Sequence, residues 1–389
     1  MTEDPFRSRI ETQLIHAGEP DPRIAGAVAM PVFQSSTFEH HAEDGGGYHA
    51  VRYIRLNNTP NHLALHAKLS AIEGGEAAIV ASSGMAAIST ALLSLLGAGD
   101  HLIVQQGVYG GTHDLVTKDL PRLGIEHTFI DAADPASWAA ALRSSTRVIY
   151  VEAISNPLLR VGALPAVAAF ARTAGIVSMI DSTFATPVNL RPIEHGFDLV
   201  AHSCTKYLNG HSDLVAGAVI GRAPLVEAVK RKLDHLGGTL DPHACFLLHR
   251  GMKTLALRVR HQNQSALTLA RRLEQHPAVA RVFYPMLESS PDHARARALL
   301  AGGGGMLSFE LTGGLAAAER MLGRLRLPIQ APSLGGPETL ITRPAVTSHA
   351  GLDPEERRRM GISDGLVRLS VGIEAIEDLI EDFERALAD

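Results

Sequence analysis

One lysine of this sequence lies in a setting that favours covalent chemistry. Lys206 stands among small hydroxyl residues, shortly after the mostly apolar stretch 197–201, which is typical of a buried strand. Upstream, the apolar stretch 177–180 predicts a second buried strand and delivers Asp181 at its carboxyl end, where α/β sheets place their functional groups. A lysine can bind an aldehyde covalently, and an acid can keep a pyridine nitrogen protonated. Together the two residues indicate pyridoxal phosphate, although either one alone would more often be a solvated lysine or a helix-capping aspartate.

Short apolar runs alternate with helical patterns and supply the elements that must position these residues. This alternation predicts an α/β fold, with a mostly parallel sheet between layers of helices, for a large domain at 61–256. The expected strands are 77–81, 101–105, 126–130, 147–152, 177–181 and 199–202.

The segments on either side of the large domain differ from it in pattern. Residues 1–60 are rich in proline, glycine and polar residues and show little periodicity, so we expect an arm that packs on something else. A long helical pattern at 253–276 leads to a smaller α+β domain at 257–389, with strands at 306–311 and 366–370. A length of 389 residues suits two such domains.

Composition excludes several classes of function. The formal net charge is −5, and lysine and arginine are spread along the chain, so no basic stripe indicates nucleic-acid binding. The two cysteines rule out a disulfide framework and fit a reducing compartment. The amino terminus has no apolar signal region, and no apolar run is long enough to span a membrane. We therefore expect a soluble cytoplasmic protein without membrane or nucleic-acid partners.

A candidate phosphate site follows the first expected strand. Gly84 and Met85 open a helix there, and backbone N–H groups at a helix start attract anions, while glycine permits close approach. Considered alone, the segment would also suit an ordinary turn between a strand and a helix.

Ordered sequence motifs from residue 12 to residue 374 resemble the Cys/Met-metabolism family of pyridoxal phosphate enzymes. That family contains cystathionine γ-synthase, cystathionine β- and γ-lyases and methionine γ-lyase. The resemblance implies the aspartate aminotransferase-like fold (fold type I), pyridoxal 5'-phosphate as cofactor and an amino acid as substrate. It also implies a homotetramer made of two dimers, in which each active site is shared between subunits.

By this resemblance, the phosphate group of the cofactor is bound by four residues of the chain and by the arm of a neighbouring subunit. Backbone N–H groups of Gly84 and Met85 and the hydroxyls of Ser203 and Thr205 would hold it beside Lys206. Tyr53 and Arg55 would reach the phosphate of the adjacent subunit's cofactor, a role that suits the forked guanidinium.

The resemblance also assigns the cofactor ring and the substrate. Tyr109 would stack on the ring and pass a proton to the leaving group, and Asn156 would bond the ring oxygen. Asp181 would stay ionised against the pyridinium. Arg368, with Ser333 beside it, would clamp the substrate carboxylate, and its place inside an apolar strand supports an anion partner over a surface salt bridge.

Three positions depart from better-known members where the substrate's far end is expected. Arg52 and Pro332 stand where cystathionine-using γ-enzymes carry acids, and Gly111 replaces the cysteine typical of methionine γ-lyase. We expect a carbon–sulfur lyase that eliminates a thiol or similar group from a β- or γ-substituted amino acid, giving a 2-oxo acid and ammonia. Arg52 is then expected to contact the substrate. A γ-replacement synthase acting on an activated homoserine is the alternative.

Two other classes remain to be distinguished. An inactive relative kept for assembly would lack the yellow colour of the bound cofactor, and intact Lys206, Asp181, Tyr109 and Arg368 argue against it. A nicotinamide enzyme would need a Gly-x-Gly-x-x-Gly motif after its first strand, which is missing.

The nineteen histidines suggest a metal site only weakly. His62 and His66 lie one helical turn apart, and 39–41 is a dense cluster, but neither group has a third ligand at a recognisable spacing. We therefore expect surface histidines and no metal.

Overall fold

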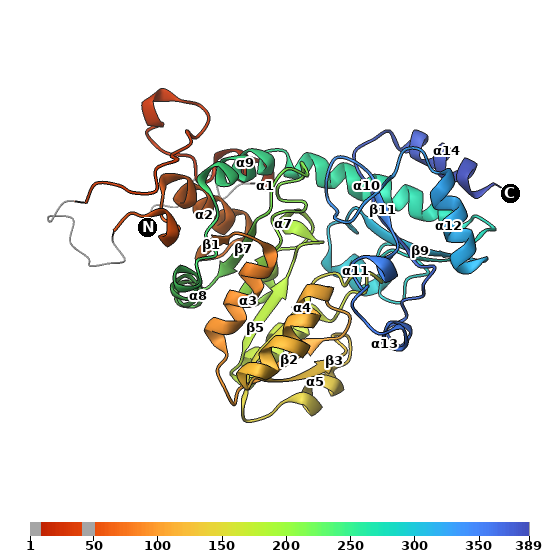
Figure 1. The fold of residues 1–389 in the computed structure, drawn as a ribbon, viewed down its shortest axis with the longest axis horizontal. Helices are drawn as coiled ribbons and strands as arrows, with labels where there is room; N and C mark the ends of the chain where they lie inside the picture. The colour runs from red at the N-terminus through yellow and green to blue at the C-terminus, as the bar shows by residue number, and fades with distance from the viewer. Residues whose placement is uncertain (1–8, 41–50, 389) are drawn as a thin grey trace.

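A mostly parallel sheet forms the centre of the large domain in the computed structural model, which describes residues 9–40 and 51–388 (Figure 1). Within these residues the sheet has seven strands, and only β7 runs antiparallel to both of its neighbours. In spatial order the strands are β1 (Ala77–Ala81), β7 (Gly217–Gly221), β6 (Leu199–His202), β5 (Val177–Asp181), β4 (Thr146–Glu152), β2 (His101–Gln105) and β3 (Glu126–Ile130).

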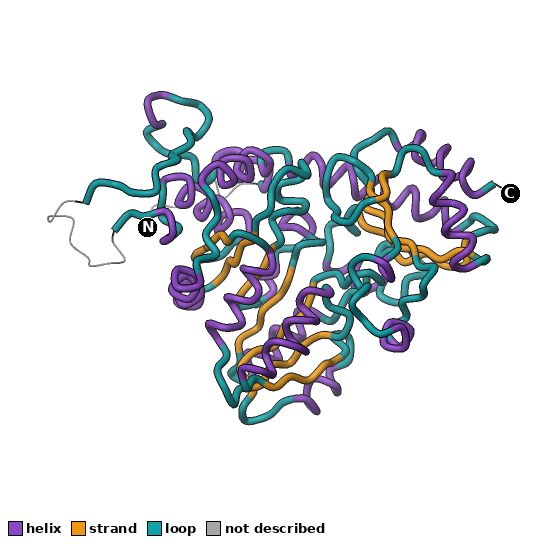
Figure 2. Tube along the Cα trace, viewed as in Figure 1, coloured by secondary structure: helices purple, strands orange, loops and turns teal. Residues whose placement is uncertain are grey.

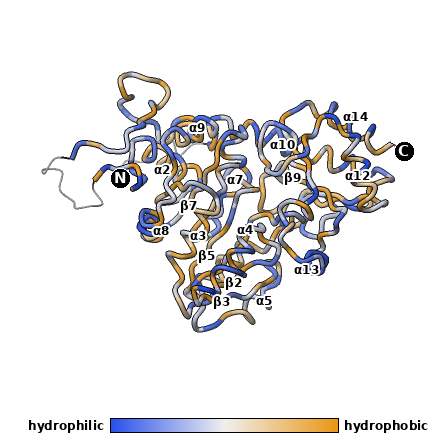
Figure 3. The backbone as a smooth tube through the Cα atoms, viewed as in Figure 1, coloured by the Kyte–Doolittle hydropathy of each residue, from blue (hydrophilic) through white to orange (hydrophobic). Residues whose placement is uncertain are grey.

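Both faces of this sheet are covered, because successive strand residues belong to two different apolar clusters. Val148 faces one cluster and Ile149 the other, and Ile79 and Val80 divide in the same way. Figures 2 and 3 show the helices on either side and the apolar strands between them. The helices of this domain are α2 (Pro60–Glu73), α3 (Gly84–Leu95), α4 (Gly110–Asp114), α5 (Pro135–Ala141), α6 (Leu164–Ala174), α7 (Thr186–Asn189), α8 (Ala223–Leu236) and α9 (Pro242–Met252).

Six strands were expected in this domain and all six are present, with β4 beginning one residue earlier than predicted. The seventh strand, β7, was not predicted, because glycines at both of its ends weaken the strand signal. Gly217 is required by packing, since a Cβ there would lie 2.0 Å from the Ser83 backbone oxygen.

The amino-terminal arm is more regular than expected at one place. Helix α1 (Ile10–His16) packs on α2 and on α10 (Leu255–Glu274), and its Leu14 side chain is buried. The Lys68 ammonium of α2 donates a hydrogen bond to the Leu14 carbonyl oxygen at 2.7 Å. This part of the arm therefore packs on its own chain.

The smaller domain has a mixed sheet of five strands within the described part of the chain. Helix α10 runs into it from the large domain and crosses the predicted boundary at residue 256, which stays a prediction (Figure 1). In spatial order the strands are β10 (Ile329–Gln330), β11 (Leu340–Thr342), β12 (Val367–Ser370), β9 (Met306–Leu311) and β8 (Val279–Phe283), and the further helices are α11 (His293–Leu299), α12 (Gly314–Arg324), α13 (Pro354–Arg359) and α14 (Ile376–Leu387).

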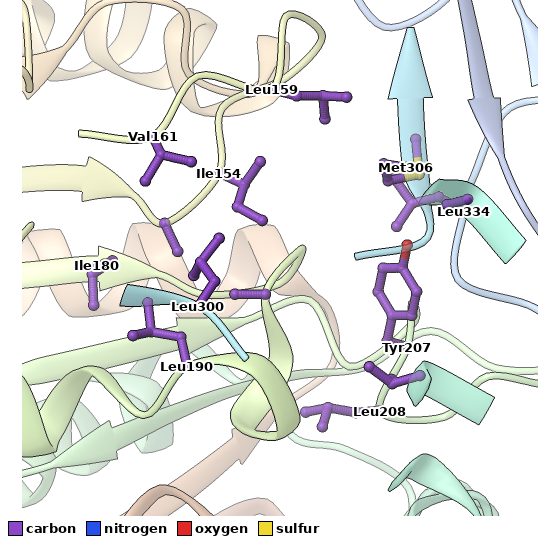
Figure 4. Close-up of a cluster of buried hydrophobic side chains, with 14 of the residues drawn as sticks. Ile154, Leu159, Val161, Ile180, Leu190, Tyr207, Leu208, Leu300, Met306 and Leu334 are labelled. Atoms are coloured by element: carbon purple, nitrogen blue, oxygen red, sulfur yellow. The ribbon is translucent and has the colours of Figure 1, made fainter. Parts of the chain in front are cut away.

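Apolar side chains join the two domains behind the site described below. Figure 4 shows Tyr207 of the large domain close to Met306 and Leu334 of the smaller domain. All three are buried, so their removal from water stabilises the domain contact. Among the described residues, no helix has the length and apolar character needed to span a membrane.

Candidate active site

A cavity of about 610 Å³ lies at the carboxyl ends of β4, β5 and β6 and is closed by loops of the smaller domain. It brings together ten of the thirteen residues expected to bind cofactor or substrate. These ten are Gly84, Met85, Tyr109, Asn156, Asp181, Ser203, Thr205, Lys206, Ser333 and Arg368.

Lys206 lies in the loop that follows β6, and its ammonium donates a hydrogen bond to the Ser333 hydroxyl at 2.8 Å. Burial, and then the nearby Arg368 charge, lowers the pKa of Lys206 to about 8. Ser333 adopts a φ of +94°, a backbone strain that proteins keep mainly at functional sites. The strained loop thus holds a lysine that is more easily neutral than a surface one.

Asp181 is the last residue of β5 and is open to the cavity but otherwise enclosed by protein. One of its carboxylate oxygens accepts a hydrogen bond from the Thr183 backbone N–H at 2.8 Å. Burial raises the pKa of Asp181, so a cation in front of it is needed to hold it fully ionised. A protonated pyridine nitrogen would be such a cation.

The predicted phosphate cradle lies at the start of α3. A Cβ on Gly84 would lie 2.7 Å from the Ser203 Cβ, so only glycine leaves space between the helix start and this hydroxyl residue. Ser83 caps the helix by accepting the Ala86 N–H at 3.0 Å. The Thr205 hydroxyl donates to and accepts from the Ala216 backbone, at 3.2 and 3.0 Å, so it is fixed by its own loop.

Arg368 of β12 is buried, and its guanidinium donates to the Asn156 side-chain oxygen at 3.1 Å and to the Ser333 carbonyl at 3.4 Å. No carboxylate of the described residues forms an ion pair with it. Burial lowers the pKa of Arg368 to about 10. A buried cation without an anion is costly, so the site favours an anionic ligand.

Three predicted residues of the arm lie outside this cavity. The Arg55 guanidinium donates to the Asp234 carbonyl at 2.7 Å and lies 5.8 Å from the centre of the Tyr53 ring. The Arg52 guanidinium lies 5.6 Å from the centre of the Phe38 ring. None of them lines the cavity of its own chain, whereas Pro332 does.

The expectation of surface histidines is wrong for His62. Its ring is buried and bonds the Thr59 hydroxyl and the Leu240 carbonyl, both at 2.7 Å. His66 is half-buried and accepts the Val80 backbone N–H at 3.2 Å. The His62 ring therefore fixes the start of α2, and the His66 ring joins α2 to β1. Within 9–40 and 51–388 no group of three metal-ligating side chains is present, and His41 of the cluster at 39–41 lies outside the described residues.

Sequence reasoning missed several residues of the cavity wall. Glu152 ends β4, and its carboxyl accepts the Tyr109 N–H at 2.6 Å. The Thr183 hydroxyl accepts the Ser203 N–H at 2.8 Å, and thereby joins the Asp181 and Lys206 segments. Thr347 and Ser348 close the cavity from the smaller domain. The pairing of adjacent strand ends could have indicated Glu152, but no local pattern marks the other three.

These contacts fit the predicted cofactor. The helix start with its glycine suits a phosphate, the buried Asp181 needs a cation, and Lys206 offers an amine of lowered pKa. The unpaired guanidinium of Arg368 suits a substrate carboxylate.

Comparisons with known proteins agree with the predicted cofactor. The family model described as "Cys/Met metabolism PLP-dependent enzyme" matches residues 11–388. The chain is 42% identical to the cystathionine beta-lyase of Bacillus subtilis (strain 168), over 98% of this chain and 96% of that protein. It is 41% identical to the L-methionine gamma-lyase of Porphyromonas gingivalis, over 99% and 98% of the two chains. The crystal structure of a cystathionine gamma synthase from Xanthomonas oryzae pv. oryzae, in complex with aminoacrylate and cysteine, superposes with a TM-score of 0.93 and 38% identity, covering 98% of both chains.

Proposed function

Because this chain belongs to the Cys/Met metabolism family of pyridoxal phosphate-dependent enzymes, we propose that it eliminates a thiol or similar leaving group from a β- or γ-substituted L-amino acid. The products are a 2-oxo acid and ammonia. One observation carries the proposal: Lys206 and Arg368 both bond to Ser333, through its hydroxyl and its carbonyl. The two cations therefore stand within reach of the amino carbon and the carboxylate of one amino acid.

The bound cofactor supplies a covalent handle for the substrate's amino group and a ring that accepts the electrons left when the α-proton departs. Lys206 is the base that takes this proton, and a pKa of about 8 leaves part of its amine neutral at neutral pH. Arg368 binds the carboxylate, and Asp181 keeps the proton on the ring nitrogen. The Tyr109 hydroxyl donates a proton to the leaving group.

The remaining contacts divide between holding the phosphate and orienting the ring. Backbone N–H groups of Gly84 and Met85 and the Ser203 hydroxyl would hold the phosphate, with Thr205 supporting the loop. The Asn156 amide N–H would bond the ring oxygen, while its side-chain oxygen accepts from Arg368. Asn156 thus connects Arg368, which binds the substrate carboxylate, to the binding site of the cofactor ring.

The outer part of the cavity favours a substrate tail without an ammonium group. The carboxylates among its described lining residues are Glu152 and Asp181, both at strand ends on the floor. Pro332 and Val215 form part of the rim. A buried ammonium without a partner is costly, so cystathionine is a poorer substrate than methionine or an O-substituted homoserine.

The enzyme works as a homotetramer of two dimers, with Tyr53 and Arg55 completing the cavity of a neighbouring subunit. Their position outside their own cavity and the extension of the arm away from the body of the chain support this assembly (Figure 1). Arg52 would then meet the substrate tail from the neighbour. We place the enzyme in the cytoplasm, because its two cysteines are both buried and unpaired.

A γ-replacement synthase is the second candidate. It is favoured by the close superposition on the cystathionine gamma synthase, whose crystal structure is a complex with aminoacrylate and cysteine. The two candidates share the removal of the α-proton and differ in whether a thiol adds before release.

A substrate panel tests the proposal. Cystathionine, methionine and O-acyl homoserines are incubated with the loaded enzyme, with and without added thiol, and the 2-oxo acid, ammonia and sulfur products are identified. A 2-oxo acid formed without thiol supports the lyase, whereas a product formed only with thiol supports the synthase. A loaded enzyme that converts none of them would contradict both.

A further inference from the structure

Two carboxyl groups lie side by side on the cavity floor. Glu152 ends β4 and Asp181 ends β5, and the two residues are register partners in adjacent parallel strands. Side chains at paired positions point to the same face of a sheet, and both of these line the cavity. The proposed chemistry uses only Asp181, so the role of Glu152 is open.

The Glu152 side chain is held by the segment that carries Tyr109. Its Oε1 atom accepts the Tyr109 backbone N–H at 2.6 Å, and the Asn156 backbone N–H also points at this carboxyl. The Glu152 backbone N–H in turn donates to the Gln105 side-chain oxygen at 3.0 Å. One buried carboxyl thus fixes the start of α4 and the loop after β4.

No cation of the described residues pairs with Glu152. The groups that face it are Asp181 and Tyr150 and the two backbone N–H groups. Lys206 and Arg368 share the cavity but bond to Ser333 and Asn156 instead. On the far side of Asp181, His202 of β6 is bonded to Glu73 of α2 at 2.5 Å. Asp181 is therefore the carboxyl that lies beside an imidazole, and in the proposed function it is also the one that faces the ring nitrogen of the cofactor.

We propose that Glu152 works as a neutral carboxylic acid and is a positioning residue, whose oxygen holds the Tyr109 N–H so that the Tyr109 ring stays over the cavity. Two adjacent carboxylates in an enclosed site do not both ionise readily, and the one without a nearby cation keeps its proton. Burial, and then the Asp181 charge, raises the pKa of Glu152 well above its ordinary value, in agreement with this geometry. The inference rests on the roles proposed above for Tyr109 and Asp181.

The first test compares three variants of the loaded enzyme. Glu152→Gln keeps the size of the side chain and its accepting oxygen. We therefore expect kcat within about threefold of the wild-type value and no shift in the absorbance of the cofactor. Glu152→Ala removes the acceptor and should lower kcat by about tenfold or more, with weaker cofactor binding, because Tyr109 loses its anchor. A Glu152→Gln variant as damaged as Glu152→Ala would overturn the inference, because the negative charge would then be required.

The second test observes the proton directly. Difference infrared spectra of the loaded wild-type protein and Glu152→Gln should contain the carbonyl band of a protonated carboxyl group in the wild type alone. Absence of that band would overturn the inference.

Stability against pH gives a third, independent measurement. An acid whose folded pKa is raised contributes stability that is fully present below its unfolded pKa and is lost as the pH rises towards the folded pKa. Above pH ~5, the ratio of the folding equilibrium constant of Glu152→Gln to that of the wild type should therefore rise by up to about tenfold per pH unit. Glu126→Gln is the control, because that side chain is 71% exposed and no such gain is expected. Equal pH dependence in wild type and Glu152→Gln would overturn the inference.

Failure of the proposed function can be distinguished from failure of this inference. A wild-type protein that converted no amino acid would contradict the proposed function and leave the infrared and stability results unchanged.

Discussion

The floor and the rim of the cavity are built differently. On the floor, Glu152, Asp181 and Lys206 stand at or just after the ends of buried strands, and each makes a hydrogen bond within the chain. On the rim, Val215 is 59% exposed and Pro332 is also exposed. The groups that are proposed to do the chemistry are therefore fixed by the core of one subunit, whereas the groups that meet the substrate tail are not.

This difference indicates which positions of the site tolerate substitution. A residue held by strand ends cannot shift without disturbing the sheet, so substitutions on the floor that remove a hydrogen bond or a charge used in the reaction are expected to alter the rate strongly. A rim residue with few contacts can be replaced with little effect on folding, and its substitution is expected to alter substrate preference. The experiments below test this contrast from its strongest consequence to its weakest.

Lys206→Ala should abolish activity, with a loss on the order of 10³-fold or more, because it removes both the covalent attachment and the base. Borohydride reduction of the loaded wild-type protein, followed by peptide mapping, should find the cofactor on Lys206. Lys68 provides an internal control, since it is buried with a pKa lowered to about 7 but lies outside the cavity. Label on Lys68 would mean that a lowered pKa, rather than a position in the cavity, determines which lysine binds the cofactor.

Asp181→Asn should keep the fold and still bind the cofactor, yet lose about 10²-fold or more in kcat, because an amide cannot hold the ring nitrogen protonated. Glu152→Gln is the matched control, because it replaces a carboxyl by an amide on the adjacent strand and is expected to lower kcat only slightly. Near-normal turnover of Asp181→Asn would mean that this carboxylate only caps the turn at Thr183.

Much of the floor could be predicted from the sequence, because strand periodicity is local. The apolar run ending at Asp181 identifies a strand end, and the hydroxyl residues around Lys206 mark a loop that approaches a ligand. Helix α2 likewise ends at Gly74, whose φ of +74° favours glycine, as the pair Gly74 and Gly75 indicates.

The rest depends on contacts between distant segments. Strand β7 is short and glycine-bounded, and it is fixed by its approach to Ser83 and by pairing with β1 and β6. Helix α1 has only seven residues and is stabilised by burial of Leu14 and the bond from Lys68. The burial of His62 also depends on the Leu240 carbonyl, which is distant in sequence. No local pattern contains these partners.

The proposed sharing of the active site is tested by complementation. Arg55→Ala and Lys206→Ala should each be nearly inactive alone, because one lacks the phosphate contact given to a neighbour and the other lacks its own lysine. Mixed and allowed to exchange subunits, they should recover up to about a quarter of wild-type activity, since half of the dimers are hybrid and each hybrid has one intact site. Recovery no greater than for two copies of the same variant, or an active monomer in sedimentation, would contradict the shared site.

The smallest effect concerns the rim. Pro332 lines the cavity and is exposed, and the described lining residues place their carboxylates only on the floor. A carboxylate introduced at this position would meet a substrate ammonium in a partly solvated setting, where an ion pair contributes up to about 1 kcal/mol. Pro332→Glu should therefore raise kcat/KM for cystathionine relative to methionine by about fivefold.

Pro332→Gln is the matched control, because it has the same size and lacks the charge. Both variants should keep the wild-type cofactor spectrum and nearly the same kcat/KM for methionine, since the residues on the floor are unchanged. Added salt should reduce the gain of Pro332→Glu, as expected for an exposed ion pair. An equal gain in the two variants would show that the shape of the loop, rather than its charge, sets the preference, and a wild-type enzyme that already prefers cystathionine would show that another carboxylate reaches the tail.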